Sequence, residues 1–125
     1  MALPVLHALN RVFLAESTTS MATSPVAMNF VVPVSGYLRN VIAATTGTTT
    51  GTITLAVAQN GGSDLAASGL TIAAGAGYIP STFTFPMTGS GAVFVNSGDV
   101  ITVTPSGGTG SSITGAVTLV IAANT

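Results

Sequence analysis

The side chains that could take part in acid–base or nucleophilic chemistry are few and lie far apart in the sequence. The only histidine is His7, and the only acids are Glu16, Asp64 and Asp99. A catalytic triad needs a base beside a nucleophile and a third group that orients the base. His7 is far in sequence from both aspartates, and no serine has the Gly-x-Ser-x-Gly frame of a nucleophile elbow. The sequence therefore predicts that the protein is not an enzyme.

The two aspartates occur in sequences that are typical of turns, NGGSD for Asp64 and NSGD for Asp99. Aspartate side chains in turns accept hydrogen bonds from nearby backbone N–H groups. A Ca²⁺ site needs several oxygen ligands in one loop, and two isolated acids do not provide them. The glycines of the PSGGTG segment are followed by no lysine, so they do not form a phosphate loop. We expect no metal ion and no cofactor.

Charge is scarce throughout the chain. Two arginines, no lysine and three acids give a net charge of -1, and charged residues make up 4% of 125 residues, against about 25% in an ordinary domain. Two cations cannot neutralise a run of phosphates, so no nucleic-acid partner is expected. No stretch reaches the roughly 20 apolar residues that span a bilayer, so no membrane partner is expected either. The N-terminus lacks the basic start of a signal peptide.

From Pro25 onward, apolar residues alternate with polar ones between regularly spaced turn signals, which predicts short strands. Leu38, Ile42 and Ala44 are expected to share one strand face, with Asn40 as an exception between them. Phe83, Phe85 and Met87 are expected to share another face, and we interpret the two phenylalanines as core residues. The predicted strands cover residues 28–32, 37–44, 52–59, 68–74, 82–87, 92–95, 99–104 and 113–122.

Two predicted strands have a face of small, uncharged residues where a sheet exposed to water usually has charged ones. Ile53, Leu55 and Val57 are expected to point inward, which turns the threonines and alanines between them outward. Thr114, Ala116 and Thr118 form a similar face on the last strand. Long edge strands without charge invite pairing with another chain. These faces are either a neutral surface or a contact with further protein, and we favour the contact.

The first 24 residues differ in composition, so we divide the chain into an arm and linker, 1–24, and a β domain, 25–125. Leu6, Leu9 and Phe13 have helical spacing, which predicts a short helix after Pro4. An extended arm remains the other interpretation, followed by a polar linker over residues 17–25. The arm packs on its own domain or docks on a neighbouring subunit or a capsid, and we favour docking. The candidate binding residues are Leu3, Val5, Leu6, Leu9, Arg11, Val12 and Phe13.

Strand order, turn placement and composition together resemble a known family. The run FVVPVSGYLRNVIAATTGTTTGTITLAVAQNG is followed by VNSGDVITVTPSGG and SSITGAVTLVIA. This series, over roughly residues 27–123, is similar to the small jelly-roll decoration, or cement, proteins of tailed-bacteriophage capsids. The resemblance implies an all-β jelly-roll sandwich, which we expect to contain about eight antiparallel strands preceded by the N-terminal arm or short helix.

The resemblance also implies a structural function and a location. Members of the family form homotrimers on the outside of an icosahedral virion, bind the major capsid protein and carry no catalysis. The expected function is therefore a capsid decoration protein that stabilises the shell. The alternative is a phage fibre, tail or adhesin domain that binds a host-surface glycan. A major coat subunit is disfavoured because no basic arm is present to meet a genome.

Overall fold

The computed structural model describes residues 10–110 and 113–123, and this part of the chain contains nine β-strands and no helix. No helix in it is long and apolar enough to cross a membrane. The nine strands are β1 Arg11–Thr18, β2 Met28–Val31, β3 Gly36–Thr45, β4 Ile53–Gln59, β5 Thr71–Ile72, β6 Ser81–Thr84, β7 Phe94–Val95, β8 Val100–Ser106 and β9 Gly115–Ala123.

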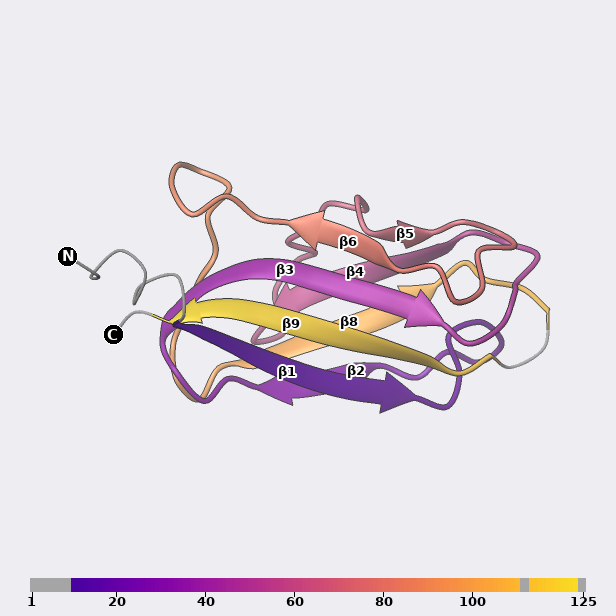
Figure 1. Cartoon of the computed structure of the whole chain (residues 1–125), viewed down its shortest axis with the longest axis horizontal. Coiled ribbons are helices and arrows are strands. Elements are labelled where there is room, and N and C mark those ends of the chain that lie inside the picture. Colours follow the sequence, from indigo (N-terminus) through magenta and orange to yellow (C-terminus); the bar gives the residue numbers. More distant parts are fainter. Residues whose placement is uncertain (1–9, 111–112, 124–125) are drawn as a thin grey trace.

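The strands form two antiparallel sheets that face each other as two layers (Figure 1). Sheet A has the order β1-β9-β3-β6, with β7 also paired to β3, and sheet B has the order β2-β8-β4-β5. Apart from the connection of β4 to β5 and the short step from β6 to β7, each connection crosses from one sheet to the other. A five-stranded and a four-stranded antiparallel sheet joined in this way form a jelly-roll sandwich, so the predicted fold class is confirmed.

The core fills the space between the two layers. Ile53, Leu55 and Val57 of β4 are fully buried, as their alternation predicts. They meet Leu38 and Val41 from the opposite sheet in one apolar cluster. Phe85 also belongs to this cluster and Phe83 packs against it, so the prediction that both rings serve the core is confirmed. Met87 lies beyond the end of β6 and is exposed, so it does not share their environment.

Strand β1 occupies residues that the sequence assigned to the arm and linker. It pairs with β9 along its whole length, from Arg11 opposite Ala122 to Thr18 opposite Gly115. The predicted short helix therefore does not extend over Arg11–Phe13, and its remaining residues lie outside the described part of the chain. The helical spacing of apolar residues was misleading, because Val12 and Leu14 also fit the alternation of a strand with one buried face.

The segment between β1 and β2 is packed rather than free. Met21, in the predicted polar linker, is fully buried and belongs to the core cluster. Its N–H donates to the carbonyl of Ile113 at 2.7 Å. Gly115 makes room for it, because a Cβ at that position would lie 2.5 Å from the Met21 side chain. A single apolar residue in a polar segment has no period, which is why the pattern missed it.

A β-bulge in β3 explains why the predicted inward face of that strand is wrong. Leu38 pairs with Ile121 and Asn40 pairs with Val120, so Arg39 is an extra residue between them. One extra residue reverses the alternation beyond it. Val41 and Ala43 therefore point into the core, while Ile42 and Ala44 are half-buried on the outer side.

Candidate interaction surface

One side of the sandwich has two edge strands, β1 of sheet A and β2 of sheet B, whose outer edges pair with no other described strand (Figure 1). Along β1, Val12 and Leu14 pack against the core, which anchors the strand. Phe13, which lies between them, points outward, and its side chain is 64% exposed. Over the eight residues of β1, every second residue thus presents its backbone N–H and C=O groups at the edge that faces away from β9.

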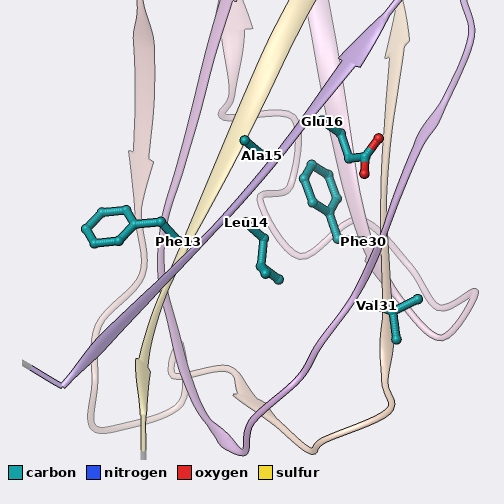
Figure 2. Close-up of a pocket in the computed structure, with 6 residues that line it drawn as sticks. All are labelled: Phe13, Leu14, Ala15, Glu16, Phe30 and Val31. Atoms are coloured by element: carbon teal, nitrogen blue, oxygen red, sulfur yellow. The ribbon is translucent and has the colours of Figure 1, made fainter.

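A shallow cavity of about 200 Å³ lies between these two edge strands. Figure 2 shows Leu14, Glu16 and Phe30 on one side of the β1 ribbon, with the Phe13 ring on the other side. Phe30 is buried, whereas Val31 of β2 is 66% exposed. Glu16 is the only charged residue that lines the cavity. We call this feature the β1/β2 groove; its lining residues are Phe13, Leu14, Ala15, Glu16, Phe30 and Val31.

The outward side of sheet A has an apolar region beside Phe13. Val120 alternates with the core residues Leu119 and Ile121, so it points outward, yet it is only 4% exposed. Its direct neighbours across the sheet are Phe13 and Asn40. Further along the same side, Tyr37 and Phe94 form an edge-to-face ring pair with centroids 5.2 Å apart. This side therefore presents the exposed Phe13 ring at the β1 edge and a second aromatic pair on β3 and β7, beyond β9.

The outward side of sheet B has no charged residue among its paired strand positions. Thr102 donates a hydrogen bond to the side-chain oxygen of Asn29 at 2.7 Å, so polar groups here are partly satisfied by each other. The small, uncharged face predicted for residues 52–59 is present. The outward residues of sheet B are Asn29, Val31, Thr54, Ala56, Ala58, Thr71, Val100, Thr102, Thr104 and Ser106.

The outward side of sheet A is nearly as neutral. Arg11, at the start of β1, is the one charged residue in its alternation, and Arg39 lies outside that alternation in the bulge, where its guanidinium donates to the carbonyl of Phe85. The remaining outward residues are Phe13, Ala15 and Ser17 on β1, Tyr37, Asn40, Ile42 and Ala44 on β3, Thr82 and Thr84 on β6, Phe94 on β7, and Ala116, Thr118, Val120 and Ala122 on β9.

Both predicted turn aspartates accept hydrogen bonds from backbone N–H groups. Asp64 accepts hydrogen bonds from the N–H groups of Val57, Ala66 and Ser68 at 2.9–3.0 Å. Burial raises the pKa of Asp64, but these three bonds together outweigh burial, and the pKa lies below its ordinary value. The Asn96 N–H is the main cause that lowers the pKa of Asp99, with help from side-chain hydrogen bonds to Gln59 and Asn60. The turn interpretation of both residues is confirmed.

Part of the predicted binding set lies on the free edge. Arg11 and Phe13 are exposed on β1, whereas Val12 packs against the core and cannot act as part of a detached arm. Leu3, Val5, Leu6 and Leu9 lie outside the described residues. Glu16, Phe30 and Val31 complete the β1/β2 groove, and the sequence did not single them out as a group. β2 lies beside β1 only because the two sheets pack face to face, and no local sequence pattern predicts that packing.

Within the described ranges, no three His, Cys, Asp or Glu side chains come together as a metal site. The same residues leave no buried side-chain nitrogen or oxygen without a hydrogen-bond partner. The fold and surface thus define a β jelly roll with neutral faces and one free edge. No protein-family model and no curated protein matches the chain.

Proposed function

We propose that the protein is a decoration (cement) protein of a tailed-phage capsid, which binds the outer surface of the icosahedral head as a homotrimer and stabilises the shell. The observation that supports this most is the jelly roll with two nearly uncharged outward faces. Soluble domains usually carry a charged surface. Surfaces of Thr, Ala and Val suit contact with other protein, because burying them removes no charge from water.

Binding rather than chemistry is the proposed mechanism. The major capsid protein is the proposed partner, and three copies in one trimer would reach neighbouring capsid subunits at once. Linked weak contacts gain from effective concentration. A ligand that binds only the assembled shell shifts the equilibrium toward assembly by mass action. Arg11 and Phe13 contribute from β1, and Leu3, Val5, Leu6 and Leu9 contribute from the segment that precedes it.

The test uses heads of a tailed phage whose genome encodes this chain. Mass spectrometry should find the protein in purified heads, and cryo-electron microscopy should show its density outside the shell near the three-fold positions. Shells stripped of the protein should disassemble at a lower temperature, and adding it back should restore their stability. Absence of the protein from mature heads, or failure of the folded protein to bind shells at micromolar concentration, would falsify the proposal.

A second candidate is a fibre or adhesin domain that binds a neutral glycan, and one observation favours it. Tyr78 is 76% exposed in the connection from β5 to β6, and its φ of 64° is rare for a bulky residue. Its N–H donates to the carbonyl of Thr45 at 2.7 Å, which holds the loop against the threonine-rich turn after β3. Binding to a glycan array that Tyr78→Ala abolishes would support this candidate over the capsid proposal.

A further inference from the structure

The free edge of β1 is long and unpaired in the described part of the chain. Its partner β9 occupies one side only, and no described strand lies on the other. Natural edge strands are usually short or protected by lysine, proline or a bulge. β1 has eight residues, contains no lysine or proline, and pairs with β9 without a break in register. Such an edge can accept one more strand through its backbone.

The β1/β2 groove beside this edge fixes the kind of side chains that an added strand must carry. Leu14, Phe30 and Val31 present apolar surface to the cavity. Glu16 places one carboxylate on the same side of β1 as Leu14. A strand with mostly apolar residues on its inward face, and one group that can donate to a carboxylate, would complement it.

The first nine residues of the chain, MALPVLHAL, have these properties. They contain no Asp, Glu, Lys or Arg. Nine residues extend over roughly 30 Å, enough to reach an adjacent copy. In a strand, Val5, His7 and Leu9 fall on one face. An antiparallel register that sets Leu9 across from Leu14 also sets His7, the only histidine, across from Glu16.

We propose that residues 5–9 of one copy add as an antiparallel strand to β1 of a second copy and cover its β1/β2 groove. In this register His7 of the first copy donates a hydrogen bond to the Glu16 carboxylate of the second. The same chain cannot supply this strand, because Leu9 across from Leu14 would leave residues 10–13 as the reversing loop. Arg11–Phe13 instead pair with β9, and the Asn10 carbonyl accepts from the Ala123 N–H at 2.9 Å.

Arm exchange of this kind joins two different surfaces, the segment before β1 and the edge of β1. A contact between different surfaces closes into a ring when the rotation between copies permits it. The inference deepens the proposed function, since it rests on the self-association proposed there and names the contact that would hold the trimer. It requires nothing of the capsid, so it can be tested on the protein alone.

The chain has no cysteine, so any disulfide that forms must join two introduced cysteines. Two full-length variants, His7→Cys and Glu16→Cys, are prepared with different mass tags, mixed and oxidised mildly. Directly opposed residues in antiparallel strands have Cβ atoms close enough for a disulfide. We expect a covalent heterodimer of the two variants. The matched control mixes Leu6→Cys with Glu16→Cys, because Leu6 would fall on the opposite face, and its yield should be at least about tenfold lower.

The double variant His7→Cys/Glu16→Cys separates exchange from folding back. Exchange predicts disulfide-linked dimers and trimers on a non-reducing gel, and native mass spectrometry should show oligomers of the unmodified protein. A disulfide confined to single chains, equal yields for Leu6 and His7, or an unmodified protein that stays monomeric would each overturn the inference. Oligomers that cross-link as expected yet do not bind shells would contradict the capsid proposal alone. Monomers that bind shells would contradict arm exchange and the homotrimer, and would leave capsid binding supported.

Discussion

The two long edges of the sandwich are built in different ways. On one edge lie β5 and β6, which have two and four residues, and on the other lie β1 and β2. The connection from β4 to β5 covers the edge formed by β5 and β6. Ala66 and Leu70 of this connection are buried in the core, and a Cβ on Gly69 would lie 2.7 Å from the Phe83 ring of β6. No comparable cover of described residues lies over β1 and β2, where the groove is open.

From this difference we expect the covered edge to contribute mainly to the stability of the domain, whereas contact with other molecules is what we propose for the free edge. At the covered edge, the Phe83 and Phe85 rings of the β6 segment lie with centroids 4.8 Å apart, and Asp64 holds the β4–β5 connection to β4 through the Val57 N–H. The free edge leaves Phe13 and Val31 exposed. Substitutions on the covered edge should therefore change folding, and substitutions on the free edge should change association.

The largest effect is expected for Phe85→Ala. Phe85 is 2% exposed and belongs to the core cluster, so removing its ring leaves a cavity and should lower the free energy of unfolding by about 3–5 kcal/mol. Urea denaturation followed by circular dichroism measures this. Phe94→Ala, at a ring that is 38% exposed, is the control and should cost clearly less. Equal losses at the two positions would contradict the assignment of Phe85 to the core.

Asp64→Ala should have the next largest effect. The substitution leaves three backbone N–H groups, of Val57, Ala66 and Ser68, without their acceptor. A lost acceptor of this kind should lower the free energy of unfolding by about 1–3 kcal/mol. Asp64→Asn keeps one carbonyl oxygen and should fall between the variant and the unmodified protein in the same urea experiment. An Asn variant as unstable as the Ala variant would show that charge, not the acceptor, holds this turn.

Acid should weaken the covered edge through the same residue. The pKa of Asp64 is lower in the folded protein than in the unfolded chain, so its contribution to stability is complete above the unfolded pKa, about 3.9. It is lost as the pH falls from there through the folded pKa. The urea midpoint of the unmodified protein should drop over this range, and that of Asp64→Asn should drop less. Parallel curves for the two proteins would rule out Asp64 as a source of the acid sensitivity.

The smallest effect on folding is expected at the free edge. Phe13→Ala removes a ring that is 64% exposed, so the free energy of unfolding should change by about 0.5 kcal/mol or less. The same variant should weaken self-association or shell binding, read by sedimentation velocity and by co-sedimentation with shells. A variant that loses stability but associates normally would reverse the roles assigned to the two edges.

The sequence predicted most of the strands and both turn aspartates, because alternation and turn chemistry are local. It missed β1, where residues at helical spacing also fit a strand, and it missed the burial of Met21. It also misplaced Ile42 and Ala44, because the bulge at Arg39 depends on the partner strand β9. The sequence could not predict the β1/β2 groove for a similar reason, because the packing of the two sheets determines which residues line it.

The neutral outward sides of the two sheets also determine how the protein responds to its medium. Salt weakens contacts between exposed charges, and these sides offer almost none. Contacts made by Thr, Ala and Val surfaces instead weaken on cooling, because burial of apolar surface is driven by water entropy near room temperature. We therefore expect assemblies built on these faces to tolerate wide changes of ionic strength and to loosen in the cold.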